Sequence, residues 1–337
     1  MNVMLTCVGR RNYLVKFFQE ALENRGLVFV GDASLEAPAL QEADKSFLLP
    51  PVNHDDYFDK LLYICEQHQV RLLIPLNDLE LPLLAKQRDR FLKIGTIPVI
   101  SSSEVIDICF DKLATFKFLT DLGISVPKTY LSIKEVREAI KHQEISFPLV
   151  VKPRWGSASI GIEYPEDDEE LEFAYRRVKK TIGKSFLADI SSTNSDEYIL
   201  IQEKILGQEY GLDIINNLDG NYITTFVKHK LGMRAGETDR ALTVDNEGLR
   251  QLGEKIGKNI GHIGNLDCDV IVGQKSACVL EMNPRFGGGY PFSHVAGANI
   301  PAALIAWANG ENSNEQWLKV QTNTMSAKCD RLVTVRR

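Results

Sequence analysis

The sequence predicts an α/β protein that begins with a helix-covered parallel sheet. Through residues 1–101, short apolar runs alternate with amphipathic helical runs, which is the pattern of parallel strands joined by crossover helices. Further along the chain, strand-like runs follow one another with fewer helices between them. The chain has 337 residues, 44% of them hydrophobic and 25% charged, which is typical of a folded protein with two or three domains.

The first third of the chain has the element order of a Rossmann-like domain. Apolar runs predict strands at 2–9, 27–34, 70–78 and 97–101, and amphipathic runs predict helices at 12–26, 56–69 and 80–95. The dinucleotide fingerprint G-x-G-x-x-G is absent, because the first turn reads GRRNYL with one glycine. We therefore expect no NAD site in this domain.

Polar residues follow several of these strands at their carboxyl ends, where ligands of such sheets bind. They are Arg10, Asp32, Asn77 and Asp78. They are candidates for lining a cleft, although solvated loops are the simpler interpretation of each.

A domain boundary falls near residues 100–110. A serine cluster begins a helix predicted over 101–124, which carries Lys112 in its interior. The elements that follow are a strand, loop, strand and helix in 146–180, strand-like runs at 197–217 and 221–233, a helix at 247–264 and a hairpin at 265–285. We divide the chain into an N-terminal α/β domain (1–104), a central part with a small lid subdomain (105–197) and a C-terminal part (198–337).

A phosphate-binding loop is one interpretation of the run VVKPRWGSASIGI. Lys152 ends a strand there, and small residues follow whose backbone N–H groups can close over phosphate oxygens. A plain β-turn is an equally good interpretation of this motif alone. The loop residues are Gly156, Ser157, Ala158, Ser159 and Gly161.

The strand ILIQE ends at Glu203, and Glu209 follows shortly after it. A strand end can offer backbone groups to an adenine edge, and a nearby carboxylate suits ribose hydroxyls. Two ordinary surface glutamates remain the simpler interpretation when the run is considered alone.

The hairpin gives a sharper signal, because period-two alternation puts acidic residues on shared faces. Asp267 and Asp269 share a face of the first strand, and Glu281 and Asn283 share a face of the second. A reversal of odd length, three or five residues around 273–276, would make these faces coincide. Oxygen ligands would then converge on a site suited to Mg²⁺ and nucleotide phosphates.

The last residue of the hairpin and the residues after it add to this interpretation. Arg285 lies two residues beyond Asn283 and can stabilise charge on a transferring phosphoryl group. Three consecutive glycines at 287–289 let the backbone approach a ligand closely.

Taken in order, these motifs resemble the ATP-grasp superfamily. They are Asp111–Lys112 followed by LGISVP, then VVKP…GSASIG, then IQEKILGQEYGLD, then LDCD…LEMNPRFGGG. The signature E-x-N-P-R at 281–285 is similar to that of the carbamoyl-phosphate-synthase large-chain-like group. The resemblance covers nearly the whole chain and implies an N-terminal Rossmann-like domain followed by a two-lobed ATP-grasp fold with a single ATP-grasp unit.

The resemblance also implies roles for particular residues. Lys112 and Lys152 match the lysines that hold ATP phosphates, and Lys152 and Arg285 are the expected catalytic residues. The loop 156–161 matches the phosphate lid, and Glu209 matches the ribose ligand. Asp269, Glu281 and Asn283 match the metal ligands, with Asp267 competing with Asp269. The adenine hinge corresponds to Glu203, Lys204, Ile205 and Leu206.

The implied activity is an ADP-forming carboxylate–amine ligase that uses ATP with Mg²⁺, or Mn²⁺ in its place, and acts through an acyl phosphate on an amino acid or other small carboxylate. A carboxylate kinase, a ligase with a non-amine acceptor and a non-catalytic nucleotide-binding module are the alternatives. Substrate-side loops supply further candidates for substrate contacts: Arg234, Glu237, Arg240 and His294. A homodimer is common in this group.

Composition excludes other classes of function. The net charge is −6, whereas nucleic-acid and anionic-membrane surfaces need a basic stripe. The first residues read as a strand rather than a signal peptide, and no apolar run is long enough to span a membrane. We therefore expect a cytoplasmic protein whose partners are small molecules.

Overall fold

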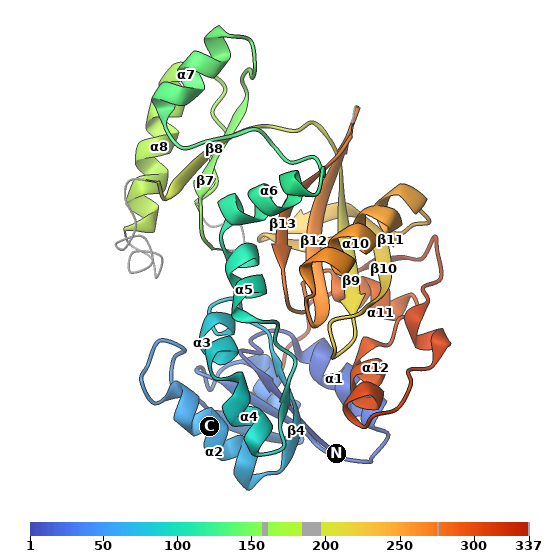
Figure 1. The fold of residues 1–337 in the computed structure, drawn as a ribbon. Helices are drawn as coiled ribbons and strands as arrows, with labels where there is room; N and C mark the ends of the chain where they lie inside the picture. Colours follow the sequence, from blue (N-terminus) through green and yellow to red (C-terminus); the bar gives the residue numbers. More distant parts are fainter. Residues whose placement is uncertain (157–160, 184–196, 275, 336–337) are drawn as a thin grey trace.

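The computed structural model describes residues 1–156, 161–183, 197–274 and 276–335. In these residues the strands form three sheets, one parallel and two antiparallel (Figure 1). This confirms the expected α/β class and the order in which a parallel sheet comes first. No helix within the described ranges is long and apolar enough to cross a lipid bilayer.

The parallel sheet lies at the N-terminus and has the order β3-β2-β1-β4-β5. Its strands alternate with helices, so that Val3 and Leu5 face one core while Met4 faces another. Helix α1 covers the first face, and α2 to α4 cover the second. The elements are β1 (Asn2–Thr6), α1 (Asn12–Leu22), β2 (Val28–Asp32), β3 (Lys45–Leu48), α2 (Tyr57–Gln67), β4 (Val70–Pro75), α3 (Leu81–Lys86), α4 (Arg88–Lys93) and β5 (Ile97–Pro98).

Two helices that we predicted as continuous are each divided in two. The predicted helix at 80–95 is α3 and α4, with a break at Gln87. The predicted helix at 101–124 is α5 (Ser103–Phe110) and α6 (Lys112–Asp121). Asp111 has an extended backbone between them, and its side chain accepts a hydrogen bond from the Leu113 N–H at 2.9 Å. Lys112 is therefore the first residue of a helix rather than an interior one.

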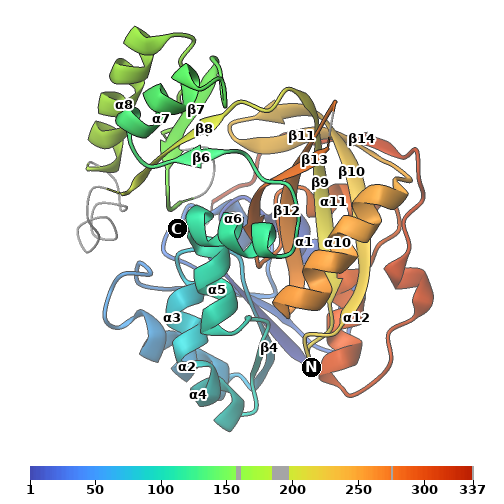
Figure 2. The ribbon, with the colours of Figure 1, turned by 45° about the horizontal axis from the view of Figure 1, so that its top comes forward.

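A small lobe stands apart from the two larger sheets (Figures 1 and 2). Its sheet has the order β6-β8-β7, and two helices pack on it around a core of its own that includes Val136, Val151 and Leu171. A capping box formed by Ser132 and Glu135 begins α7. The elements are β6 (Thr129–Tyr130), α7 (Ile133–Lys141), β7 (Leu149–Pro153), α8 (Asp168–Ile182) and β8 (Ile199–Glu203).

The third sheet is antiparallel, with the order β13-β12-β9-β10-β11-β14. Helix α10 covers one face, and it packs closely because a Cβ at Gly253 would lie 2.4 Å from the Thr225 hydroxyl oxygen. The strands are β9 (Gly207–Asn216), β10 (Tyr222–Arg234), β11 (Glu237–Thr243), β12 (Gly264–Gly273), β13 (Ala277–Asn283) and β14 (Met325–Ala327); the helices are α10 (Glu247–Ile260), α11 (Tyr290–Val295) and α12 (Ile300–Ala308).

One hydrophobic core joins the N-terminal sheet to the C-terminal part of the chain. It contains Leu14 and Phe18 from α1, Ile300 and Leu304 from α12, and Phe286 from the segment after β13. Because these distant segments share a core, the parallel sheet is held in place against the large antiparallel sheet. The three-part division of the chain at 104 and 197 stays a prediction.

We expect Phe18→Ala to destabilise the protein by about 3–5 kcal/mol, because Phe18 is fully buried and packs edge-on against Phe286 with ring centroids 6.2 Å apart. Chemical denaturation followed by tryptophan fluorescence measures the loss. Phe173→Ala is the matched control, since Phe173 is 59% exposed on α8 and should cost less than about 0.5 kcal/mol. A loss below about 1 kcal/mol for Phe18→Ala would contradict the shared core.

Candidate active site

The acidic hairpin is formed by β12 and β13, and its register sets Asp267 opposite Asn283 and Asp269 opposite Glu281. The faces coincide as the alternation predicts, but the predicted odd-length reversal is wrong. Val272 pairs with Ala277, and this register alone would set Asp269 opposite Leu280. One extra residue on β13 between Val279 and Glu281 shifts the register and brings the polar faces together.

Strand β9 lies on the other side of β12 and adds a further carboxylate. Asp213 is opposite Asp267 and is completely buried. One of its oxygens accepts hydrogen bonds from Lys228 Nζ at 2.6 Å and from Ser293 Oγ at 2.5 Å. Gly289 leaves room for this lysine, because a Cβ there would lie 2.6 Å from Lys228 Cε.

Lys230 connects two of the sequence-predicted residues. Its Nζ lies 2.7 Å from Glu209 and 2.6 Å from Asp269. Burial raises the pKa of Asp269 to about 7, and repulsion by Asp267 and Glu281 adds to the effect, while Lys230 opposes it. A cation bound beside Asp269 would favour the ionised carboxylate and lower this raised pKa.

Arg285 joins the N-terminal domain to the hairpin. One Nη lies 2.9 Å from Asp78, which follows β4, and the other lies 3.3 Å from Asp267. The Asn265 side chain holds the backbone carbonyl of Arg285 at 3.1 Å. Burial alone would lower the pKa of Arg285, but Asp78 and then Asp267 raise it, so the guanidinium stays charged.

Two buried lysines face the hairpin from the elements that precede it. Lys112 begins α6 and donates to the Gly156 carbonyl oxygen, and Lys152 lies near the end of β7 with its Nζ 5.6 Å from the Phe116 ring centroid. A bidentate pair fixes their relative position, because Arg154 contacts Asp111 at 2.8 and 2.6 Å.

The pKa values of both lysines are lowered. Burial and, after it, the neighbouring Lys112 lower the pKa of Lys152 to about 7, although Glu281 opposes them. Burial also lowers the pKa of Lys112, while Glu281 attracts the charged form. Two buried cations with no carboxylate within 4 Å among the described residues need an anion beside them, and phosphate oxygens fit that requirement.

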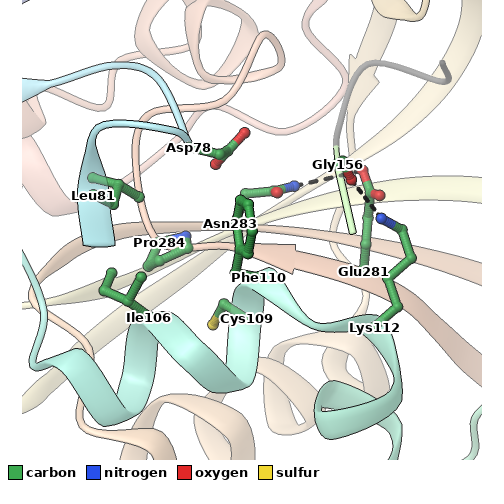
Figure 3. Close-up of a pocket in the computed structure, with 10 residues that line it drawn as sticks. All are labelled: Asp78, Leu81, Ile106, Cys109, Phe110, Lys112, Gly156, Glu281, Asn283 and Pro284. Atoms are coloured by element: carbon green, nitrogen blue, oxygen red, sulfur yellow. Dashed lines mark hydrogen bonds between the residues drawn. The ribbon is translucent and has the colours of Figure 1, made fainter. Parts of the chain in front are cut away.

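Figure 3 shows one pocket in which Glu281 and Asn283 project from β13 toward Lys112 and Gly156. Asn283 Nδ2 lies 3.5 Å from Glu281 Oε1. The described residues contain no cluster of three or more His, Cys, Asp or Glu that could hold a metal alone. Glu281 and Asn283 nevertheless supply the oxygen ligands that Mg²⁺ takes when phosphates complete its shell.

A larger cleft adjoins this pocket and encloses about 820 Å³, open solvent included. Asp78, Glu281 and Asn283 line both spaces, so the pocket and the cleft meet at the hairpin. The rest of the cleft is lined by Arg11, Leu76, Asn77, Lys228, Lys230, Met233, Gly236, Glu237, Thr238, Asp267, Asp269, Arg285, Gly288 and Gly289. It therefore lies between the N-terminal domain and the antiparallel sheet.

The predicted adenine hinge connects the small lobe to the large sheet, since it lies between β8 and β9. Glu203 accepts a hydrogen bond from the Lys128 N–H at 2.8 Å, and Lys204 Nζ lies 5.1 Å from the Tyr164 ring centroid. Leu206 is 71% exposed, and Ile205 contacts the region of Gly273. In the phosphate lid, Gly156 and Gly161 have positive φ angles, while Ser157 and Ser159 lie outside the described residues.

The four residues predicted to contact substrate lie in different places in the structure. Glu237 lines the cleft and pairs with Lys328 at 2.9 Å. Arg234 pairs with Asp239 and Asp330, and the Arg240 guanidinium packs against Gly232.

His294 stacks on Phe17 with ring centroids 3.6 Å apart, and burial lowers the pKa of His294 to about 4. Within the described residues, the lining of the cleft includes Glu237 but not Arg234, Arg240 or His294.

Sequence reasoning missed several residues of this region. Asp213, Lys228 and Lys230 are charged residues inside otherwise apolar strand runs, and that signal could have identified them. Of the four residues at the strand ends, Asn77 and Asp78 line the cleft, as the sequence suggested. Arg10 instead pairs with Asp330, and Asp32 accepts a hydrogen bond from the Gly9 N–H. The adjacent Arg11, rather than Arg10, contributes to the lining.

Comparisons with known families agree with this arrangement. Residues 109–289 match the family model of the ATP-grasp domain, and residues 3–100 match the model of the PylC-like N-terminal domain. Because the first of these covers more than half of the chain, the protein belongs to the ATP-grasp family. The members of this family are ADP-forming ligases and carboxylases, and ATP and Mg²⁺ are their characteristic cofactors.

Two curated relatives represent the sequence similarity. The carbamoyl phosphate synthase large chain of Methanosphaerula palustris is 26% identical over 262 residues, which are 75% of this chain and 23% of that protein. The D-alanine–D-alanine ligase of Thermotoga petrophila is 32% identical over 113 residues, which are 34% of this chain and 31% of that protein. The aligned part thus spans under a third of the length of either relative.

Solved structures share the fold. The biotin carboxylase domain of Hydrogenobacter thermophilus 2-oxoglutarate carboxylase, in complex with MgADP and bicarbonate, aligns with a TM-score of 0.73 at 16% identity and covers 96% of this chain and 73% of that chain. The L-amino acid ligase of Bacillus licheniformis aligns with a TM-score of 0.71 at 18% identity and covers 96% and 78%. At identities this low, the similarity shows that the fold is shared and nothing more.

We expect nucleotide binding to make the protein take up a proton at pH 8. The pKa of free Lys152 is about 7, so it is mostly neutral at that pH, and phosphates beside it raise its pKa and protonate it. Calorimetry of ATP binding in EDTA, in buffers of different ionisation enthalpy, measures the uptake. Lys152→Met should remove it and the exposed Lys60→Met should not. Equal uptake by wild type and Lys152→Met would contradict the assignment.

Proposed function

We propose that this chain is an ATP-dependent carboxylate–amine ligase that releases ADP and phosphate. The observation that carries the proposal is the shared wall between the two spaces. Glu281 and Asn283 line the pocket that contains Lys112, and they also line the open cleft. A nucleotide phosphate held by the lysines would therefore meet a substrate bound in the cleft.

The first step of the proposed reaction is phosphoryl transfer. A carboxylate oxygen of the substrate attacks the γ-phosphorus of ATP, the bond from that phosphorus to the bridging oxygen breaks, and ADP leaves. Lys112 and Lys152 hold phosphate oxygens, and Arg285 contributes a fixed positive charge at the meeting point of the pocket and the cleft. Mg²⁺, for which Glu281 and Asn283 with the nearby Asp269 are the proposed ligands, neutralises phosphate charge when it is bound.

The second step is acyl transfer. The amine attacks the carbonyl carbon of the acyl phosphate, loses its proton, and phosphate leaves as an amide forms. The cleft between the N-terminal domain and the sheet has room for a second small molecule. The similarity to D-alanine–D-alanine ligase and to an L-amino acid ligase supports an amino acid as one substrate.

A ligase with a non-amine acceptor is the second candidate. The structural similarity to a biotin carboxylase domain solved with bicarbonate favours it, because such an acceptor would fill the same cleft. That domain is described as a dimer, and we propose a homodimer for this chain as well. The proposed adenine hinge at 203–206 and ribose ligand Glu209 apply to both candidates.

Product analysis tests the proposal. Purified protein is incubated with Mg-ATP and pools of amino acids and small carboxylates, and ADP, AMP and phosphate are measured together with product masses. The proposal predicts ADP and phosphate that depend on a pool, with a condensed product mass. AMP and pyrophosphate, or ADP with bicarbonate alone as the acceptor, would contradict it.

We expect Glu281→Gln to lower ATP turnover by at least about 100-fold, because it removes a charged oxygen ligand beside the phosphates. Glu254→Gln is the control, since Glu254 forms an i,i+4 pair with Lys258 on the outer side of α10. Steady-state ADP release under saturating ATP compares the two. Turnover by Glu281→Gln close to that of the control would remove Glu281 from the metal site.

A further inference from the structure

The cleft contains four cationic side chains, and one of them differs from the others. Lys228, Lys230 and Arg285 each contact a carboxylate at hydrogen-bond distance. Arg11 has no carboxylate within 4 Å among the described residues, although it lines the same cleft. Three of the four charges are thus neutralised within the protein, and the fourth is left for another partner.

Local structure fixes Arg11 in this position. It precedes α1 as its N-cap residue, directly after the turn that follows β1. Its Nη1 donates to the Leu76 carbonyl oxygen at 2.7 Å, which holds the guanidinium against the end of β4. Its Nε is buried and has no hydrogen-bond partner. Arg11 lines the cleft, so its guanidinium can donate to an acceptor on a bound ligand.

The place of Arg11 in the cleft separates it from the reacting groups. The pocket that contains Lys112 shares Asp78, Glu281 and Asn283 with the cleft, whereas Arg11 lines only the cleft. Phosphoryl transfer in the proposed reaction takes place at the shared wall. We place the phosphorylated group beside Glu281 and Asn283, so the group that Arg11 binds is a second group of the ligand.

The charge around Arg11 favours a monoanion. Glu237 lines the same cleft. Burial raises the pKa of Glu237, but Lys328 and, after it, Arg11 lower this pKa by more. The Glu237 carboxylate is therefore ionised at neutral pH. The negative charge of Glu237 would repel a dianionic phosphate bound at Arg11 more strongly than it would repel a monoanion. A planar carboxylate matches the guanidinium in shape and carries a single charge.

We propose that Arg11 binds a substrate carboxylate that takes no part in phosphoryl transfer. This proposal rests on the proposed ligase function. It makes one substrate a molecule with a second, unreactive carboxylate, as in a dicarboxylic acid or in an amino acid that attacks through its amine. The N-terminal domain thereby selects the substrate, although the metal and phosphate ligands come from the rest of the chain.

Equilibrium binding tests the proposal without turnover. The full chain, saturated with Mg²⁺ and a non-hydrolysable ATP analogue, is mixed with a pool of L-amino acids and short dicarboxylic acids. A second pool contains the same molecules with their carboxylates converted to carboxamides, and a third probe is inorganic phosphate. Saturation-transfer NMR identifies the molecules that bind, and titration gives their Kd values.

The expected result is binding of one or more acids with at least about tenfold weaker binding of the matching amides. Arg11→Gln should weaken acid binding by about tenfold or more and remove the preference over amides, and Arg11→Lys should retain part of it. The ATP analogue should bind all variants alike. Arg25→Gln is the matched control, because Arg25 is exposed beyond the other end of α1.

Several results would overturn the proposal. They are equal binding of acids and amides, unchanged acid binding by Arg11→Gln, Arg11-dependent binding of phosphate in preference to acids, and no binding by either pool. Failure of the ligase function is a separate result: acids would bind through Arg11, but no ADP would be released. Conversely, wild type and Arg11→Gln could release ADP with the same KM for the substrate acid. That result would support the ligase function but reject the role of Arg11.

Discussion

The buried contact of Arg285 with Asp78 and Asp267 is the interaction on which the site depends. It joins the end of a strand in the N-terminal sheet to the hairpin of the antiparallel sheet, at 2.9 and 3.3 Å. Removing one partner of such a group leaves an uncompensated buried charge, which is strongly destabilising. The same guanidinium lines the cleft and contacts Asp78, which lines both the cleft and the pocket, so the group that aligns the two parts of the chain lies beside the proposed chemistry.

The other charges around the hairpin are balanced only in part. Lys230 is shared between Glu209 and Asp269, and Lys228 is enclosed with Asp213. Lys112 and Lys152 instead face the acidic hairpin with lowered pKa values, because burial disfavours their charged forms. Phosphates beside the lysines and a cation beside Glu281 would complete the balance. Substrate binding and charge compensation are then the same event.

Much of the fold could be predicted from periodicity, because strand and helix signals in the first third are strong and the acidic residues alternate clearly. What failed has local causes. Asp111 caps a new helix and divides a continuous apolar pattern, and a bulge near Glu281 restores a register that the turn alone would not give. The buried charge of Lys230 could have been noticed in its strand run, but its two carboxylate partners, like the place of Arg11 in the cleft, depend on contacts across strands and domains that a single sequence does not reveal. The residue roles carried over from the family resemblance stay predictions, although Glu281, Asn283 and Lys112 lie in one pocket.

The claim that a carboxylate is phosphorylated before any amine reacts has one direct test, which is positional isotope exchange in ATP labelled with ¹⁸O at the bridge between the β- and γ-phosphates. The protein is incubated with labelled Mg-ATP and the carboxylate pool, without amines. The proposed mechanism predicts that the label moves to non-bridging positions of the β-phosphate, because ADP and an acyl phosphate form and recombine. A label that stays in the bridge, while adding amines produces ADP, would contradict a separate acyl-phosphate step.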